Sequence, residues 1–186
     1  MEINESGVIL ICGIPGSGKT ESGRILAEML GIPFRDLDEI VVQMSGRTIA
    51  DIFAHDGEAG FRKLEGDALD DLLAEGSPKV IALGGGTLES ERARELIRKK
   101  SAALIWLKVA ASEAARRLES GGMIDERPLL KGLRGTLLTE VLLKLIDMRS
   151  GNFPQSDFAV DTDGHTSAEV ASLMAQALLG KRTWSL

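Results

Sequence analysis

The sequence predicts an α/β fold in which a parallel β-sheet lies between two layers of helices. Short apolar runs that have the character of buried strands alternate along the chain with longer helical segments. Two of these runs, at residues 8–12 and 79–83, end directly in glycine-rich segments. Ligands bind at the carboxyl ends of the strands in such sheets, so we expect both glycine-rich segments to face one crevice.

Five segments are expected to form strands because they are short apolar runs. In chain order they are residues 8–12, 33–36, 79–83, 104–109 and 158–161. The first is continuous, rich in β-branched residues and ended by Gly13, and the third and fourth are similarly clear. The second is weaker and the fifth is short.

Helices are expected where apolar residues recur on one side or where capping residues mark an end. In chain order they are residues 19–30, 48–55, 58–75, 90–100, 112–118, 136–149 and 166–179. Gly31 ends the first helix, and Thr166-Ser167-Ala168-Glu169 forms a capping box that opens the last. The charges within residues 90–100, Arg94 among them, are expected to form a solvated face. The pattern indicates one domain across residues 1–186, with a core at about 7–180.

Composition and charge exclude several classes of protein. The 28 acidic and 22 Lys and Arg residues give a net charge of −6, which disfavours sequence-independent binding of nucleic acid. No apolar run approaches the roughly 20 residues of a membrane-spanning helix. A single cysteine, Cys12, and an N-terminus without a signal-peptide pattern predict a cytoplasmic protein. We therefore expect neither nucleic acid nor membrane as a partner.

The strongest motif is Gly13-Ile14-Pro15-Gly16-Ser17-Gly18-Lys19-Thr20, which matches G-x-x-x-x-G-K-[ST] between a predicted strand and a predicted helix. Its glycines allow backbone N–H groups to surround a phosphate, and the helix N-terminus adds positive potential. Lys19 can reach the β- and γ-phosphates, and the Thr20 hydroxyl can ligate Mg²⁺. The loop predicts a nucleoside triphosphate site, but it does not distinguish an ATPase, GTPase, kinase or transporter.

Asp36 and Asp38 follow the second predicted strand. Alternate residues of an extended segment share a side, so both carboxylates can face the phosphate site. One could organise the Mg²⁺ shell through water, and the other could orient or deprotonate an attacking hydroxyl. The alternative is an exposed acidic turn in which Asp38 caps a following helix.

A kinase of a small anionic substrate needs positive charge both at the transferred phosphoryl group and at the substrate. The candidates are Arg62 early in a helix, Arg127 in a segment at about 119–135 that we interpret as a mobile lid, and Arg149 at a helix end. Each arginine alone is typical of a solvated surface. The triplet Gly84-Gly85-Gly86 is either a simple turn or a place where a substrate approaches backbone N–H groups.

Together these blocks resemble the shikimate kinase family from about residue 8 to residue 162. The resemblance rests on the phosphate loop and on a set of further blocks: Phe34-Arg35-Asp36-Leu37-Asp38-Glu39-Ile40, Gly46-Arg47-Thr48-Ile49-Ala50-Asp51-Ile52-Phe53, Gly57-Glu58-x-x-Phe61-Arg62-x-x-Glu65, Gly84-Gly85-Gly86, Arg127-Pro128-Leu129-Leu130, Arg149 and Val160-Asp161-Thr162. The middle blocks and the Arg-Pro-Leu-Leu block are specific, because other phosphate-loop kinases do not combine them.

The resemblance implies a P-loop NTPase-like, three-layer α/β/α fold of the nucleoside monophosphate kinase-like type, with a five-stranded parallel sheet and a lid. It implies a monomer that uses ATP and Mg²⁺ to phosphorylate the 3-hydroxyl of shikimate, with the substrate held by a segment at about 37–65. The roles it implies are these: catalysis by Lys19, Asp38 and Arg127; nucleotide binding by Gly13, Pro15, Gly16, Ser17, Gly18, Lys19, Thr20, Arg117 and Arg127; substrate binding by Asp38, Phe53, Phe61, Arg62, Gly84, Gly85, Gly86 and Arg149; and Mg²⁺ binding by Thr20 and Asp36.

The chain departs from the family pattern at two informative places. Glu21 follows Thr20, where the family usually has a second hydroxyl residue. Ser150-Gly151-Asn152-Phe153-Pro154 follows Arg149, where the family has a Pro-Leu-Tyr sequence. Two alternatives therefore stay open: a kinase of the same fold that acts on another small polyol acid such as gluconate, and a nucleotide-binding homologue without catalysis.

Overall fold

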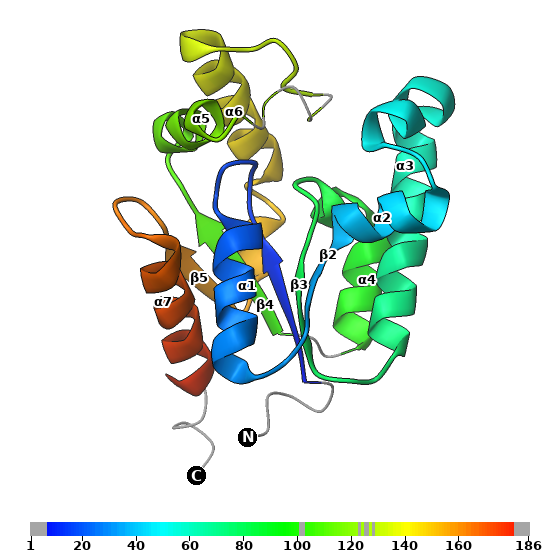
Figure 1. Ribbon diagram of the computed structural model, residues 1–186, viewed down its shortest axis with the longest axis vertical. Coiled ribbons are helices and arrows are strands. Elements are labelled where there is room, and N and C mark those ends of the chain that lie inside the picture. The colour runs from blue at the N-terminus through cyan, green and yellow to red at the C-terminus, as the bar shows by residue number, and fades with distance from the viewer. Residues whose placement is uncertain (1–6, 101–102, 123, 125–126, 128, 181–186) are drawn as a thin grey trace.

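The computed structural model describes residues 7–100, 103–122, 124, 127 and 129–180. Within these residues, strands β1 (Val8–Cys12), β2 (Phe34–Asp36), β3 (Lys79–Ala82), β4 (Ala103–Lys108) and β5 (Phe158–Asp161) form one sheet in the order β2-β3-β1-β4-β5. Every pairing is parallel, as Figure 1 shows from the common direction of the arrows. The predicted five-stranded parallel sheet is confirmed.

The central strand β1 pairs with β3 on one side and with β4 on the other, with Leu10 opposite both Ile81 and Leu104. All five of its residues are buried. A strand that is covered on both faces carries apolar residues at every position, which explains its unbroken apolar sequence.

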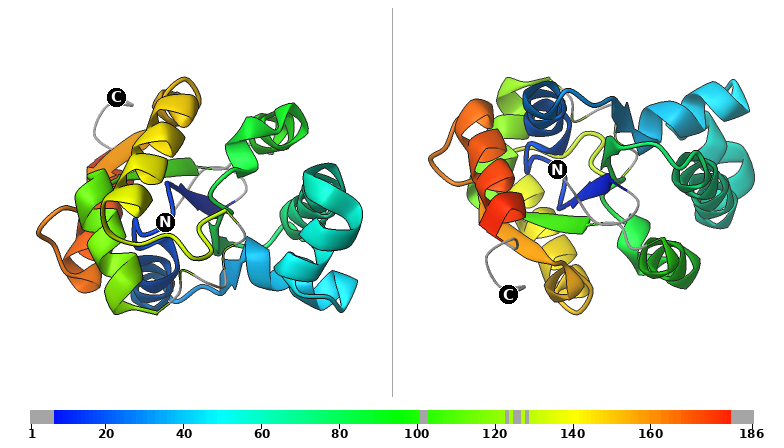
Figure 2. Two further views of the ribbon diagram at one scale, coloured as in Figure 1. Left: turned by 90° about the horizontal axis from the view of Figure 1, so that it is seen from above. Right: turned by 90° about the horizontal axis from the view of Figure 1, so that it is seen from below.

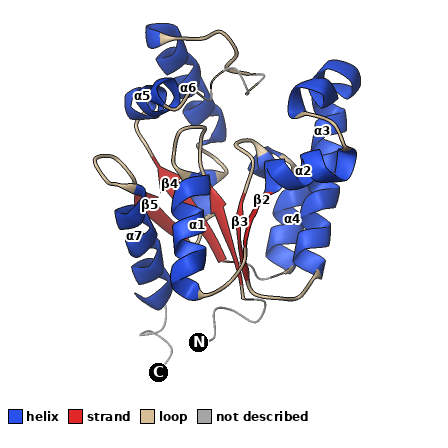
Figure 3. Ribbon diagram, in the orientation of Figure 1, coloured by secondary structure: helices blue, strands red, loops and turns tan. Residues whose placement is uncertain are grey.

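Helices cover both faces of the sheet, as Figures 2 and 3 show. The α-helices of the described residues are α1 (Lys19–Leu30), α2 (Leu37–Ser45), α3 (Ile49–Ala74), α4 (Glu91–Lys99), α5 (Ala111–Ser120), α6 (Gly135–Arg149) and α7 (Ser167–Gly180). Ile9 and Ile11 of β1 pack with α1 and α7, whereas Leu10 packs in the cluster that holds α3, α4 and α6. The two-residue alternation of a strand therefore divides the core into two layers.

The predicted capping box is present at the start of α7. The backbone N–H of Thr166 donates to the Glu169 carboxylate at 2.8 Å, and the backbone N–H of Glu169 donates to the Thr166 hydroxyl at 3.3 Å. None of the helices in the described residues is long and apolar enough to cross a membrane.

Helix α2 was not expected, and it changes the interpretation of the two aspartates. Asp36 ends β2 and caps α2, and its carboxylate accepts a hydrogen bond from the backbone N–H of Asp38 at 3.1 Å. The expectation of an extended segment through Asp38 is therefore wrong, as is the alternative in which Asp38 is the cap. The helix forms because Leu37 and Val41, four residues apart, are both buried against the core.

The two helices expected at 48–55 and 58–75 are confirmed, and they are joined across a kink at Gly57 within the range of α3. Gly57 breaks its regular geometry with φ 67° and ψ −174°, a conformation that is essentially restricted to glycine. Phe53 lies before the kink and Arg62 after it, so the kink decides how these two side chains face each other.

The loops that follow β1 and β3 lie at the same end of the sheet as the start of α2 (Figure 1). Strands β2 and β3 lie on one side of β1, and β4 and β5 lie on the other. The carboxyl end of β1 is therefore the point at which the connections between strands turn to opposite sides of the sheet. A crevice at that point is the usual ligand site of an open parallel sheet.

Candidate active site

The loop between β1 and α1 is a cradle made by glycine geometry. Gly13, Gly16 and Gly18 have φ values of 152°, 84° and 88°. A Cβ on Gly13 would lie 2.6 Å from Ser17 Oγ, and one on Gly16 would lie 2.7 Å from the carbonyl oxygen of Ala114. Ser17 Oγ is buried and has no hydrogen-bond partner within the described residues. This orphaned donor and the crowded glycines fit a loop shaped around the phosphates of a nucleotide.

Lys19 lies across this loop at the start of α1. Its Nζ donates to the carbonyl oxygens of Gly13 at 2.9 Å and Ile14 at 3.1 Å. The pKa of Lys19 is lowered to about 8, mainly by burial and also by the charge of Arg127, while the Asp38 carboxylate opposes the shift. In the described residues the hydrogen-bond partners of this ammonium group are uncharged carbonyl oxygens, and phosphate oxygens would give it negatively charged partners.

The hydroxyl of Thr20 donates to the Asp36 carboxylate at 2.8 Å. This pair presents hard oxygen atoms beside the phosphate loop, which are the ligands that Mg²⁺ prefers, so the residues fit the ion. Within the described part of the chain, no three His, Cys, Asp or Glu side chains are grouped to hold a metal ion by themselves. Such a site suits an ion whose remaining ligands are water molecules and nucleotide phosphates.

Asp38, in the first turn of α2, has a perturbed carboxylate. Its pKa is raised to about 6, mainly by burial and also by the Asp36 and Glu65 carboxylates, while Lys19 and Arg127 oppose the shift. A Cβ on Gly84 would lie 2.9 Å from Asp38 Oδ1 and 2.6 Å from Glu65 Oε1. The first glycine of the triplet therefore allows two carboxylates to converge against the backbone.

Arg62 of α3 lies beside this acidic group. Its Nη1 donates to Glu65 Oε2 at 2.8 Å, while Glu65 Oε1 accepts from the hydroxyl of Thr87. The guanidinium lies 5.4 Å from the ring centre of Phe61, and the rings of Phe61 and Phe53 are 4.9 Å apart. The structure thus brings together Arg62 and the two phenylalanines, and their role as a wall of the acceptor pocket stays a prediction.

Arg149, the last residue of α6, is buried, with only 4% of its surface exposed. Its Nε donates to the Glu89 carboxylate, and its Nη1 is buried with no hydrogen-bond partner among the described residues. A Cβ on Gly85 would lie 3.5 Å from Nη1, and one on Gly86 would meet the guanidinium groups of both Arg62 and Arg149. Two arginines from distant helices therefore face the same glycine triplet.

The charge of Arg127 lowers the pKa values of both Lys19 and Asp38. This effect indicates that Arg127 lies near the phosphate loop. Its Nε is buried and has no hydrogen-bond partner in the described part of the chain. Residues 123, 125–126 and 128 of the expected lid, Pro128 of the Arg-Pro-Leu-Leu block among them, lie outside the described residues. The mobility of the segment 119–135 stays a prediction.

Arg117 of α5 is held by three contacts. It donates to the Glu113 carboxylate at 2.7 Å, to the carbonyl oxygen of Thr162 at 2.6 Å and to the hydroxyl of Thr162 at 3.1 Å. The guanidinium therefore ties α5 to the end of β5. Its expected stacking on adenine stays a prediction.

Sequence reasoning gave no role to Glu65, Thr87 or Glu89. A signal existed for Glu65, because it follows Arg62 by three residues in a helix and such residues are neighbours on one helical face. Glu89 has no comparable signal, since its partner Arg149 is 60 residues away in the chain.

The fold and the phosphate loop are those of a P-loop phosphotransferase, and a carboxylate and two arginines lie at the glycine triplet beside that loop. The family model of shikimate kinase matches residues 15–179, and the chain belongs to that family. It is 43% identical over 134 residues to a shikimate kinase of Saccharopolyspora erythraea, covering 72% of this chain and 73% of that one. The structure of the Acinetobacter baumannii shikimate kinase in complex with shikimate is similar with a TM-score of 0.84 and 28% identity, covering 95% of this chain and 94% of that one.

The alternative acceptor class has a weaker counterpart among solved structures. A gluconokinase from Sinorhizobium meliloti is similar with a TM-score of 0.61 and 20% identity, covering 96% of this chain and 94% of that one. This likeness shows a shared fold alone. The family membership thus favours shikimate kinase over the gluconate alternative.

Proposed function

We propose that this protein transfers the γ-phosphoryl group of ATP to the 3-hydroxyl of shikimate, giving shikimate 3-phosphate and ADP. Besides the family membership, one observation carries the proposal. The buried, unpartnered Nη1 of Arg149 lies at Gly85, beside the guanidinium of Arg62 at Gly86. A planar guanidinium fork is the group best matched to a carboxylate, so these two arginines bind the acid group of the acceptor.

Asp38 orients the acceptor hydroxyl and takes its proton. A pKa of about 6 leaves the carboxylate ionised at neutral pH, yet basic enough to accept a proton as the new bond forms. The position of Asp38 beside Gly84 keeps it at the same glycine triplet that the arginines face. Phe53 and Phe61 form the apolar wall against which the ring of the acceptor packs.

The phosphate side of the site is cationic. Lys19 and Arg127 bind the phosphate oxygens and stabilise the charge that develops on the transferred group. Thr20 and Asp36 would hold Mg²⁺, directly or through water, and the ion would supply positive charge at the phosphates. Closure of the segment 119–135 over the site excludes water, which would otherwise compete with the acceptor hydroxyl.

A coupled assay of ADP release tests this proposal. The protein is incubated with Mg·ATP and, in separate reactions, with shikimate, quinate and gluconate. We expect rapid release with shikimate and little with the other two acids. Lys19→Met is the matched control, because loss of the ammonium group should abolish turnover with every acceptor. Faster release with gluconate than with shikimate would overturn the assignment of the acceptor.

We further infer that the protein acts as a cytoplasmic monomer. One chain supplies every residue assigned to the site, so a second copy is not needed to complete it. Sedimentation at a mass near the 19.9 kDa of a single chain is the expected result.

A further inference from the structure

Glu89 holds the side chain of Arg149. Glu89 ends a short 3₁₀ turn, η1 (Thr87–Glu89), that directly follows the glycine triplet. Its carboxylate accepts a hydrogen bond from Nε of Arg149, whose side chain is only 5% exposed, whereas that of Glu89 is 31% exposed. The pair therefore joins the rim of the site to its interior across 60 residues of sequence.

The contact at Nε determines what the rest of the guanidinium can do. A guanidinium carries its five N–H donors in one rigid plane, so fixing Nε fixes the direction of Nη1 and Nη2. In this arrangement Nη1 faces Gly85 and Nη2 faces Gly86. The unpartnered Nη1 is thus aimed at the place where the acceptor acid is expected to bind.

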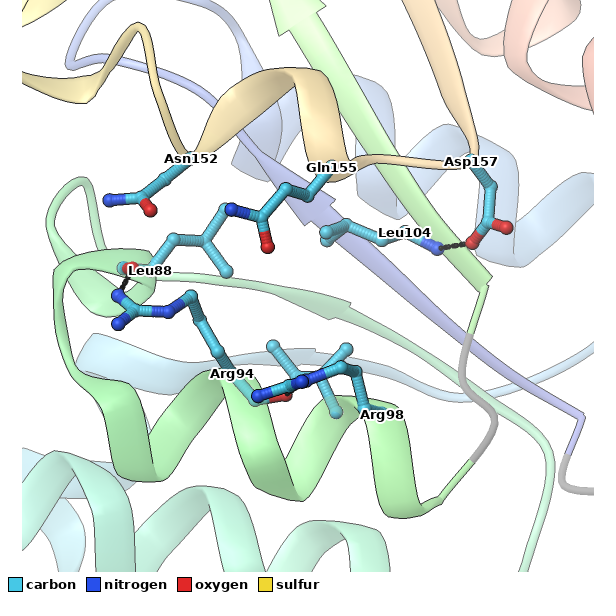
Figure 4. A pocket seen from close by; sticks show the side chains of 8 residues that line it. Leu88, Arg94, Arg98, Leu104, Asn152, Gln155 and Asp157 are labelled. Carbon is cyan, nitrogen blue, oxygen red and sulfur yellow. Dashed lines mark hydrogen bonds between the residues drawn. The ribbon is translucent and has the colours of Figure 1, made fainter.

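The backbone at Glu89 is itself held by hydrogen bonds from Arg94. The Arg94 guanidinium donates from α4 to the carbonyl oxygens of Leu88 at 2.6 Å and Glu89 at 3.1 Å. Figure 4 shows the first of these contacts beside a cavity of about 230 Å³. Arg94 is half-buried, so the expectation that it belongs to a solvated face is wrong. The backbone N–H of Glu89 also donates to the carbonyl oxygen of Gly86 at 3.0 Å.

The segment after Arg149 departs from the family pattern, so the anchoring of this arginine needs a local explanation. The carbonyl oxygen of Arg149 accepts from the backbone N–H of Asn152 at 3.0 Å, which starts the short turn η2 (Phe153–Gln155). That contact involves only the backbone of Arg149. Within the described residues, the guanidinium itself is hydrogen-bonded to Glu89 through Nε.

We propose that Glu89 is a positioning residue that orients Arg149 for the carboxylate of the acceptor. This inference rests on the proposed function, because it assigns Arg149 to acceptor binding. It makes Glu89 a determinant of acceptor affinity, with no contact to ATP. A merely structural pair would instead affect folding and both substrates equally.

Three variants test the proposal through steady-state kinetics with shikimate and ATP. Glu89→Ala removes the acceptor of the Nε hydrogen bond and should raise the KM for shikimate about tenfold, the usual cost of one charge-assisted hydrogen bond. Its KM for ATP and its kcat should stay within about twofold of the wild type. Glu89→Gln keeps an oxygen that can accept from Nε, so it should restore most of the affinity.

Glu91→Gln is the matched control, because Glu91 is exposed and makes no ion pair within the described residues. It should match the wild type in every constant. An unchanged KM for shikimate in Glu89→Ala would overturn the proposal. So would a parallel loss of kcat and of affinity for both substrates.

A second measurement separates this proposal from the proposed function. The ¹⁵N–¹H signal of Arg149 Nε is identified by its absence in Arg149→Lys. It should shift in Glu89→Ala and stay in place in Glu91→Gln, whether or not shikimate is the acceptor. If the wild type fails to phosphorylate shikimate but this shift occurs, the function falls and the positioning contact stands. An unshifted signal in Glu89→Ala overturns the positioning role.

Discussion

Asp38 shows how a single residue acquires its chemistry from its neighbours. Its carboxylate is withdrawn from water and lies near two other carboxylates, Asp36 and Glu65, and both effects raise its pKa. Lys19 and Arg127 oppose the shift, so the group remains able to ionise near neutral pH. The same five side chains therefore set both the acid–base behaviour of the site and its charge balance.

The first prediction follows from the pKa of about 6 at Asp38. The proposed reaction needs the ionised carboxylate, so kcat/KM for shikimate should fall as the pH drops through about 6. A pH profile of kcat/KM checks this. Asp38→Asn should lower kcat by about 10²-fold or more and should remove this acidic limb from any residual activity. Near-normal turnover of Asp38→Asn would contradict the role of the carboxylate.

The same shift has a consequence for stability with a definite sign. The pKa of Asp38 is raised from 3.8 in the folded protein, so the folded state binds this proton more tightly than the unfolded chain. The free energy of unfolding therefore decreases as the pH rises through the window from 3.8 to about 6. Above that window, Asp38→Asn should be more stable than the wild type in thermal unfolding. A lower Tm would show that the ionised carboxylate stabilises the folded state, which would contradict the raised pKa.

The second prediction concerns the fork of Arg62. Arg62→Lys keeps a positive charge but loses the planar pair of donors, and Arg62→Ala loses both. The KM for shikimate should rise about tenfold in Arg62→Lys and further in Arg62→Ala, while the KM for ATP changes little. Steady-state kinetics with each substrate varied in turn give the comparison. If Arg62→Lys matches the wild type, charge alone suffices at this position.

At the scale of elements, two features decide where the side chains of the site lie. The Asp36 cap starts α2 immediately after β2, which places Asp38 on a helix instead of an extended segment. The kink at Gly57 divides α3 into a part with Phe53 and a part with Arg62 and Glu65. Both features are local, yet they position groups that belong to one pocket.

The third prediction addresses this kink. Apart from its neighbours in the chain, no residue that the structure describes has an atom within 4 Å of a Cβ placed on Gly57, so Gly57→Ala creates no clash with them. Its cost is conformational, because φ 67° with ψ −174° is unfavourable for any residue with a side chain. The free energy of unfolding in urea should fall by about 1–3 kcal/mol. Lys63→Ala, an exposed site with regular helical geometry in the same helix, should change it little. Equal stability of both variants would contradict the strain.

Much of the arrangement of elements could be predicted from the sequence. Strand β1 and helix α1 were predicted with the bounds that the structure shows, because their apolar pattern and terminal glycines are local signals. Helix α2 could not be predicted in the same way. Its nine residues are too few to form a stable helix in isolation, and its formation depends on burial of Leu37 and Val41 against other elements.

At the scale of the whole molecule, Cys12 reports on the integrity of the fold. It ends the central strand, is 2% exposed, and burial raises the pKa of its thiol to about 12. The thiolate that reacts with disulfide reagents is therefore scarce and inaccessible in the folded state.

The fourth prediction uses this thiol. In the native protein, Cys12 should react slowly with a disulfide reagent at mildly alkaline pH. In urea, its reaction should release one equivalent of the reagent's thiol product per chain. Mg·ATP should slow the residual reaction of the native protein, because ligand binding stabilises the folded state. Rapid labelling of the native protein would mean that β1 opens without global unfolding. A Cys12→Ala variant gives the background rate.

The sequence by itself determined the phosphate loop, the five strands, the helices other than α2, and the residue types proposed for the acceptor site. These are encoded by neighbours within a few positions, through hydrogen bonding at helix ends and the periodicity of burial. Only the tertiary structure decided that Arg62, Arg149, Asp38 and Glu65 meet at one glycine triplet, and that Glu89 holds Arg149. Those contacts arise because the parallel sheet brings the carboxyl ends of distant strands to one edge, and no local pattern contains that information.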